Sequence, residues 1–487
     1  MRRMTRAGLR GIGLLAATGA LCAAAVVPVA GAAEPDTTWQ PDLAKGEGTG
    51  IVVGDGSARF DRGTAHGAPA SDANGDTESS ADPSNVVPTG LLTLPARDLD
   101  APTREIDSTL DADLPPGSTA TVDVRGRRAD GAWTEWIPAA STGPASPARA
   151  ELPVASREVQ GRLVLTSTGG PAPTVHSVTL SAAPASLAEA VPDTESASRS
   201  FSVFATREGL VGGTTANGHR ITDRDRFVAL PSRRALSADG KSDYSVKICA
   251  PNGRCAFAPV WDIGPWNTQD DYWNAGRTRE RFADLPQGMP QASAAYRDGH
   301  NGGRDQFGRK PANPAGIDLG DGIFWDALGL KNNSQVQVDY LWTGSRRLSA
   351  IRAEGSPDVP ILSAPRTGAS VVGMAADSAD VPLECVQGTG AQRYVQIGDK
   401  QYVRASAVRE LPADLPACGA AAPAPATSAT PAPAASATPA PAPAPATAAP
   451  APATSPAQSP ANTPAGEQQA APRIQPGSAQ RAQSSAS

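Results

Sequence analysis

The sequence predicts an all-β protein in which a β-sandwich, a closed β-barrel and a third compact β unit are flanked by ends that do not fold. Two observations favour this class. Apolar runs are short and are interrupted by many of the 48 glycines and 47 prolines, a spacing typical of strands and turns. Sixteen of the 22 aromatic residues lie between residues 201 and 342, whereas residues 421–487 hold 15 prolines and no aromatic residue. One segment can therefore build a substantial core, and the tail cannot.

Residues 1–32 are expected to form a signal peptide. Residues 1–10 carry four arginines and no acidic residue, residues 11–29 are almost entirely apolar, and small residues follow at 30–32. An uncleaved anchor is the alternative, because the apolar run is just long enough to span a bilayer. Glycines and a threonine dilute the run and favour cleavage. We therefore expect a secreted protein, extracellular or cell-wall-associated, with no membrane contact after cleavage.

The charge and the cysteines narrow the function classes. Loss of the signal peptide changes the formal net charge from −6 to about −10, so nucleic acid is not an expected partner. Only four histidines are present and they are widely spread, so we expect no metal site and no cofactor. The spacing of the first two remaining cysteines suits a hairpin disulfide, and the pairing of the other two stays open. The cysteines expected in disulfides are Cys249, Cys255, Cys385 and Cys418.

The segment before the aromatic-rich region divides into two parts. Residues 33–84 are rich in Gly, Asp, Ser and Thr and are expected to be a flexible leader. Residues 85–185 contain several short β-rich runs, which predict a sandwich that resembles the jelly-roll-like modules of secreted actinobacterial proteins. Trp133 and Trp136 lie in an expected hairpin. We favour one core and one rim tryptophan, and a sugar-stacking platform is the alternative.

The aromatic-rich segment, residues 201–345, is expected to form a small closed barrel. Its apolar runs have the length of short strands, and only residues 322–330 have a helical pattern. The six expected strands are 201–204, 227–230, 244–249, 255–261, 317–319 and 336–342.

Two further segments complete the chain. Residues 355–411 contain several short strands and form the third compact unit. Residues 419–487 alternate Ala and Pro with Thr and Ser. Proline at this density blocks helix and sheet and favours extended polyproline II, so this disordered tail is expected to be a spacer or a glycan-bearing stalk.

Four motifs occur in a fixed order within the aromatic-rich segment. They are T-A-N-G-H at 215–219, F-V-A-L-P-S-R at 227–233, V-W-D-I-G-P-W at 260–266 and G-I-D-L-G at 316–320. This order resembles the double-psi β-barrel of the rare lipoprotein A-like and expansin-like families, in which a T-A-N-G turn, an A-H-x-x-L-P strand, a D-x-G-P loop and an I-D-L-S segment follow one another. The resemblance covers about 140 residues. It implies a six-stranded double-psi barrel.

The resemblance also implies a catalytic acid. In the lytic members the aspartate of the I-D-L segment is the main acid/base, which implies Asp318 in that role and Asp262 as its partner. Both lie among apolar residues, which raise the pKa of a carboxyl as a proton donor requires. Asn217 and His219 of the T-A-N-G-H turn are expected to bind substrate. The chain departs from the lytic pattern at His219, where an acid is usual, and at Phe227, where a histidine is usual.

Both aspartates also have a structural alternative, because an Asp in such a position often caps a turn or a helix. The insertion between the last two motifs is rich in polar and aromatic residues. Trp266, Tyr272 and Trp273 are expected to stack on sugar rings, or alternatively to pack as a lid on the barrel. Two adjacent acids at 270–271 lack the spaced ligands of a calcium loop.

Residues 355–411 resemble a bacterial SH3-like domain. The matching runs are I-L-S-A-P at 361–365, S-V-V-G-M at 370–374, Y-V-Q-I at 394–397 and Q-Y-V at 401–403. Leu362, Tyr394 and Gln401 replace residues that are usual in the binding groove, so a wall-binding module and a purely structural unit both remain open.

Three hypotheses follow. The first is a secreted protein that acts on peptidoglycan, or another cell-wall polysaccharide, in the manner of a lytic transglycosylase, with Asp318 as the acid/base and Asp262 assisting it. The second is a non-catalytic, expansin-like carbohydrate-binding protein. The third is a wall scaffold or adhesin that performs no chemistry.

Overall fold

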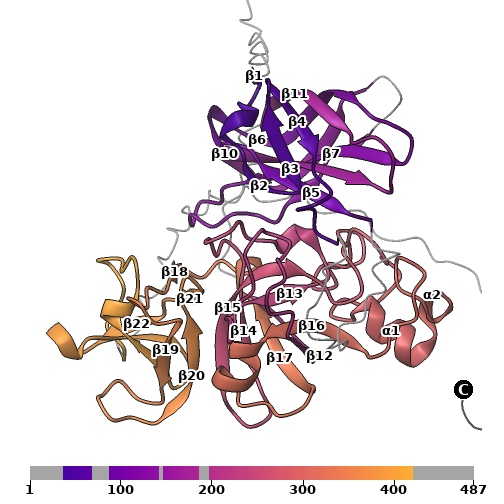
Figure 1. Ribbon diagram of the computed structural model, residues 1–487. Helices are drawn as coiled ribbons and strands as arrows, with labels where there is room; N and C mark the ends of the chain where they lie inside the picture. Colours follow the sequence, from indigo (N-terminus) through magenta and orange to yellow (C-terminus); the bar gives the residue numbers. More distant parts are fainter. Residues whose placement is uncertain (1–36, 68–86, 142–145, 186–196, 420–487) are drawn as a thin grey trace, which may run out of the picture. The chain divides into compact units, whose positions relative to one another are not determined.

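The computed structural model describes residues 37–67, 87–141, 146–185 and 197–419. The expected signal peptide and the expected tail lie outside these residues. The described chain is mostly β, as predicted, and consists of an N-terminal barrel, a central barrel and a set of C-terminal strands (Figure 1). Two disulfides, which are typical of extracellular proteins, join Cys249 to Cys255 and Cys385 to Cys418. None of the helices in the described ranges is long and apolar enough to cross a membrane.

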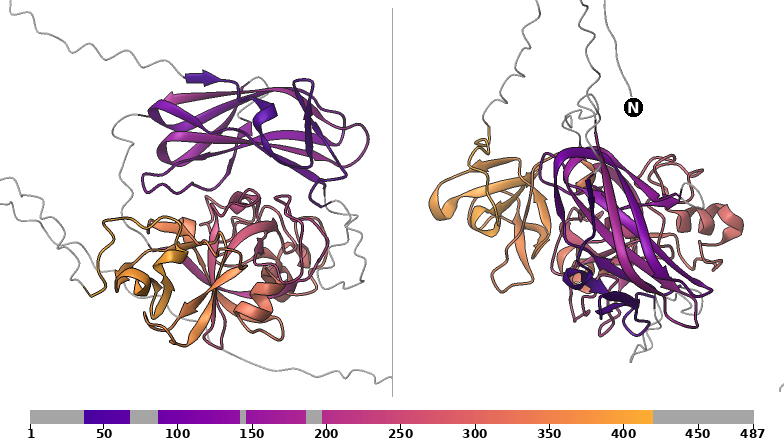
Figure 2. Two further views of the ribbon diagram at one scale, coloured as in Figure 1. Left: turned by 60° about the vertical axis from the view of Figure 1, so that its left-hand side comes forward. Right: turned by 90° about the horizontal axis from the view of Figure 1, so that it is seen from above.

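The N-terminal barrel is a nearly closed antiparallel barrel of seven strands, in the order β2-β5-β10-β6-β11-β4-β3 (Figure 2). The sequence predicted a sandwich. Two strands of 17 and 20 residues, β6 and β10, instead curve round and pair with different neighbours along their length. The strands are β1 Thr37–Trp39, β2 Glu47–Thr49, β3 Ile51–Gly54, β4 Ser57–Phe60, β5 Thr89–Thr93, β6 Arg97–Asp113, β7 Ser118–Gly126, β8 Ile137–Pro138, β9 Ala140–Ser141, β10 Ala148–Ser167 and β11 Thr174–Pro184.

The expectation of a flexible leader is corrected for residues 37–67. Strands β1 to β4 belong to the sheet of the N-terminal barrel. Ala58 and Phe60 of β4 are buried in its core with Ile106 and Leu163. The segment is polar on average, but these few apolar side chains are enough because strands β6, β10 and β11 together supply 11 of the 20 buried residues of this core.

The central barrel is a closed, mixed barrel of six strands in the order β13-β16-β12-β17-β14-β15, closed by pairing of β13 with β15. Two pairings are parallel, β12 with β16 and β13 with β15, and the other four are antiparallel. All six strands lie where the sequence predicted strands. They are β12 Arg199–Glu208, β13 Val228–Leu230, β14 Ser245–Cys249, β15 Cys255–Ile263, β16 Ala315–Gly320 and β17 Ser334–Tyr340.

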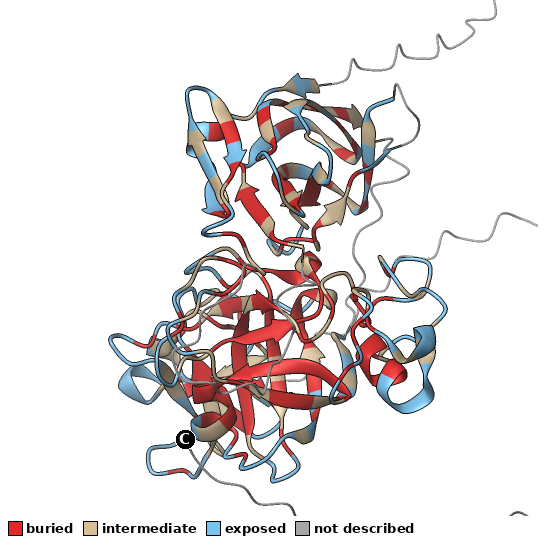
Figure 3. Cartoon of the chain, turned by 45° about the vertical axis from the view of Figure 1, so that its right-hand side comes forward, coloured by how far each residue is buried: buried red, intermediate tan, exposed pale blue. Residues whose placement is uncertain are grey.

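The core of the central barrel is continuous and buried on every strand (Figure 3). The β14–β15 hairpin turns at Gly253, whose φ of +84° suits glycine, and the Cys249–Cys255 disulfide staples its ends. The expected helix at 322–330 is a single π-helical turn, Gly322–Ala327. Two helices in the insertion were not predicted, α1 Gln291–Asp298 and the short α2 His300–Gly303, because α1 is mostly alanine and small polar residues without a clear apolar stripe.

The C-terminal strands extend the sheet of the central barrel through a parallel pairing of β15 with β20. This approach requires glycine at position 373, because a Cβ there would lie 1.7 Å from the carbonyl oxygen of Cys255. Short antiparallel strands follow, as the sequence predicted for this segment. They are β18 Leu348–Ala350, β19 Asp358–Leu362, β20 Val371–Ala376, β21 Asp380–Pro382, β22 Cys385–Gln387, β23 Tyr394–Gly398 and β24 Gln401–Arg404. The SH3-like assignment stays a prediction.

Candidate functional site

The topology of the central barrel brings the two predicted carboxyls to either side of one strand. Strand β13 pairs with β16 on one side and with β15 on the other. Ala229 in β13 lies opposite Asp318 in the first ladder and opposite Asp262 in the second. Two residues that are 56 positions apart in the sequence therefore lie across a single strand from each other.

Asp318 is a buried carboxyl held by one hydroxyl. Its side chain is 5% exposed, and the Thr206 hydroxyl on the neighbouring strand β12 donates a hydrogen bond to Oδ1. Burial raises the pKa of Asp318 to about 7, the Thr206 hydrogen bond opposes this rise, and the nearby Asp262 adds to it. A carboxyl with this pKa is protonated in an appreciable fraction of molecules at neutral pH, as a proton donor must be.

Asp262 anchors the T-A-N-G turn to the barrel. Its Oδ1 accepts hydrogen bonds from the backbone N–H of Ala216 at 2.7 Å and of Ile263 at 2.8 Å. The Nδ1 atom of His66, in the N-terminal barrel, lies 3.6 Å from the same oxygen. The structural role that the sequence left open for Asp262 is thus present, and it fixes this carboxylate next to Asp318.

A third carboxyl, Glu208, belongs to the same cluster and was missed by the sequence analysis. It is 4% exposed. Burial, followed by Asp262 and Asp318, raises its pKa well above the ordinary value. The signal that reveals it is the parallel register: Thr206 lies opposite Asp318, and Glu208, two residues further along β12, points to the same face.

This carboxyl cluster, Glu208, Asp262 and Asp318, is short of positive charge. In the described part of the chain, no lysine or arginine forms an ion pair with any of the three. Another acid close to Glu208, Asp321, pairs with Arg207 at 3.0 Å. Glu208 Oε2 is buried without a hydrogen-bond partner. Burying three carboxyls without a lysine or arginine partner destabilises a fold, so such a cluster is a candidate for a functional site.

The other two residues predicted in the T-A-N-G-H turn lie differently. Asn217 is buried, its Oδ1 accepts from the hydroxyl of Thr215 and from the N–H of His219, and its Nδ2 has no partner. The ring of His219 points to Asp225, with 2.8 Å between Nε2 and Oδ2, and packs against Trp261. The structure therefore places Asn217 in the turn that Asp262 anchors, and pairs His219 with a different carboxylate.

The aromatic residues of the insertion are mostly core residues. Tyr272 and Trp273 are completely buried, and the Tyr272 hydroxyl donates to the Gly316 carbonyl oxygen at 2.9 Å. Neither ring is available for stacking on a sugar in this structure, which corrects that expectation in favour of the lid alternative. Trp266 is half-buried, and its indole N–H donates to Asn313 at 3.2 Å. It keeps a partly exposed face next to the D-x-G-P loop.

The acids at 270–271 are occupied by arginines. Asp270 pairs with Arg279, and Asp271 pairs with Arg234 at 2.6 Å. Within the residues that the structure describes, no group of three or more His, Cys, Asp or Glu side chains is arranged to hold a metal ion.

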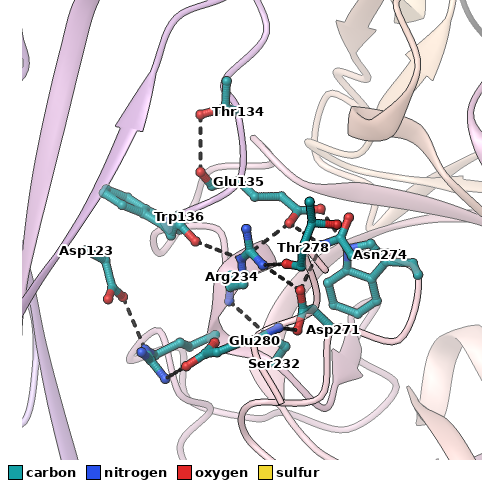
Figure 4. Close-up of polar contacts among 12 residues, drawn as sticks. Asp123, Thr134, Glu135, Trp136, Ser232, Arg234, Asp271, Asn274, Thr278 and Glu280 are labelled. Atoms are coloured by element: carbon teal, nitrogen blue, oxygen red, sulfur yellow. Dashed lines mark hydrogen bonds and ion pairs between the residues drawn. The ribbon is translucent and has the colours of Figure 1, made fainter. Parts of the chain in front are cut away.

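A polar network joins the predicted hairpin of the N-terminal barrel to the insertion (Figure 4). Glu135 accepts hydrogen bonds from the indole N–H groups of Trp273 at 2.7 Å and Trp342 at 2.9 Å. Trp136 is 2% exposed and belongs to the core of the central barrel. The Arg125 guanidinium stacks 4.3 Å from the ring centres of both Trp133 and Trp136. Trp136 is thus the expected core tryptophan, whereas Trp133, expected at the rim or in a sugar platform, is buried as well.

Comparison with known protein families finds a similarity in the central barrel. Residues 199–339 match a family described as a domain of unknown function (DUF8814), a range that coincides with strands β12 to β17. No curated protein matches the chain.

Proposed function

We propose that this is a secreted, cell-wall-associated protein that cleaves the glycan strands of peptidoglycan in the manner of a lytic transglycosylase. The observation that carries the proposal is the cluster of three buried carboxyls in the central barrel, none of which pairs with a lysine or arginine in the described ranges. The order of the four motifs and the closed six-stranded mixed barrel support its assignment to the double-psi barrels of the rare lipoprotein A-like type.

The proposed chemistry needs one group that gives and takes a proton. Protonated Asp318 donates its proton to the glycosidic oxygen as the bond from that oxygen to the anomeric carbon breaks. A hydroxyl of the same sugar then attacks the anomeric carbon and closes an anhydro ring. Its proton passes to the Asp318 carboxylate, which restores the starting state. No water is consumed, so a second carboxylate is not needed as a base, and Asp262 serves to hold the T-A-N-G turn in place.

A second candidate function is a non-catalytic, expansin-like protein that binds wall polysaccharide. The observation that favours it is the low exposure of the carboxyl cluster, 4–7% for its three members, together with the burial of Tyr272 and Trp273. Polysaccharide would then lie on the surface of the protein, with no need to reach the carboxyls.

Digestion of peptidoglycan by the wild type and by Asp318→Asn distinguishes the two candidates. Asp298→Asn, at the exposed end of α1, is the matched control because it changes the same charge on the same domain. We expect anhydro-muropeptides, detected by mass spectrometry, from the wild type and the control, and at least a hundredfold less from Asp318→Asn. If none of the three proteins gives products but all three still co-sediment with wall material, the lytic proposal is wrong and the non-catalytic binding protein is favoured.

A further inference from the structure

One histidine of the N-terminal barrel lies at the carboxyl cluster. Each of the four histidines in the chain contacts an aspartate: His176 contacts Asp113, His219 contacts Asp225 and His300 contacts Asp284. His66 is the one that contacts a member of the cluster, with 3.6 Å between its Nδ1 and Asp262 Oδ1. Both side chains are largely buried, 16% and 9% exposed.

The position of His66 is fixed by backbone bonds to a barrel strand. Its N–H donates to the Thr89 carbonyl oxygen, and the Thr89 N–H donates to the His66 carbonyl oxygen, both at 2.9 Å. Thr89 begins β5, which pairs along its length with the long strand β10. The backbone that carries the imidazole is thus held by the frame of the N-terminal barrel.

The N-terminal barrel also packs on the residues that hold Asp262. Leu91 and Val164 form one apolar cluster with Ala216 and Ile263, the two residues whose N–H groups donate to Asp262 Oδ1. A cavity of about 310 Å³ opens beside this cluster. Residues of both barrels line it, including Thr49 and Thr93 from the N-terminal barrel and Asn217 from the central one.

We propose that the N-terminal barrel completes the site, with His66 as a positioning residue that holds the Asp262 carboxylate. This inference rests on the proposed function. Three nitrogens from two barrels surround Asp262 Oδ1, and His66 is the basic side chain among them. In the described part of the chain it is the one basic side chain within 4 Å of a carboxyl oxygen of the three. Removing it loosens the Asp262 carboxylate, and with it the T-A-N-G turn beside Asp318.

The first part of the test is a double-mutant cycle in the full chain. The unfolding equilibrium is measured for the wild type, His66→Ala, Asp262→Asn and the double variant. A direct contact gives a coupling of about threefold to tenfold in the unfolding constant. His176→Ala, which removes a half-exposed contact with Asp113, is the control and should show no coupling with Asp262→Asn. Additive effects of His66→Ala and Asp262→Asn would overturn the proposal.

The second part measures peptidoglycan cleavage. We expect His66→Ala to lower kcat about tenfold or more with KM within about twofold of the wild type, because a small misplacement of a reacting group costs rate rather than binding. Added imidazole should restore part of kcat, and His176→Ala should match the wild type. Full activity of His66→Ala overturns the proposal even if the coupling is present, because the contact is then only structural. An inactive wild type overturns the proposed function itself, and the positioning role falls with it.

Discussion

The burial of Asp318 makes the stability of the protein depend on pH in a defined way. Its pKa rises from an ordinary value of 3.8 to about 7 in the folded protein. Folding is therefore not penalised below about pH 4, where the carboxyl is protonated in both states. The penalty grows as the pH rises to 7 and stays constant above it. At about 1.36 kcal/mol for each pH unit, the full penalty is about 4 kcal/mol.

Asp318→Asn removes this penalty, because an amide has the shape of the protonated acid and keeps an oxygen for the Thr206 hydroxyl. The variant should match the wild type near pH 4 and exceed its free energy of unfolding by about 4 kcal/mol at pH 8. Urea unfolding followed by tryptophan fluorescence at pH 4 to 8 measures this difference. The control Asp298→Asn should run parallel to the wild type. If the stability of Asp318→Asn also changed with pH in parallel with the wild type, Asp318 would not be a buried carboxyl with a raised pKa.

The core and the disulfides give further predictions. Trp136 belongs to the N-terminal barrel in sequence but packs in the core of the central barrel. Trp136→Ala should therefore lower the free energy of unfolding of the central barrel by about 3–5 kcal/mol. A loss below about 1 kcal/mol would show that Trp136 is not part of that core. Loss of the Cys385–Cys418 disulfide, which spans 33 residues, should cost about 4 kcal/mol, and loss of Cys249–Cys255, which spans 6, about 2 kcal/mol. Paired Cys→Ala variants in guanidinium unfolding check this order, and the reverse order would contradict the loop-length argument.

The central barrel was predictable because its six strands carry continuous apolar runs with turns between them. The hairpin of β14 and β15 was visible in its cysteine spacing and in the turn that contains Gly253. The order of the motifs also placed Asp262 and Asp318 in one site, as the ladder positions of β13 then show.

Glu208 and His66 could not be found in the sequence because their role depends on long-range pairing. Glu208 joins the carboxyl cluster only through the parallel register of β12 with β16. His66 lies in a segment whose polar composition predicted a flexible leader, and it reaches Asp262 only because β1 to β4 are built into the N-terminal barrel. For Tyr272 and Trp273 the sequence suggested a function that the structure does not support. Aromatic residues in a polar insertion are typical of a binding surface, and their burial became evident only from partners distant in sequence, such as Tyr340.

The most direct test of the account is digestion of peptidoglycan in water enriched in ¹⁸O, with the product masses measured. Intramolecular ring closure takes no oxygen from water, so a lytic reaction through Asp318 predicts anhydro products without ¹⁸O from the wild type and none from Asp318→Asn. Products that carry ¹⁸O, or equal product from both proteins, would contradict the account.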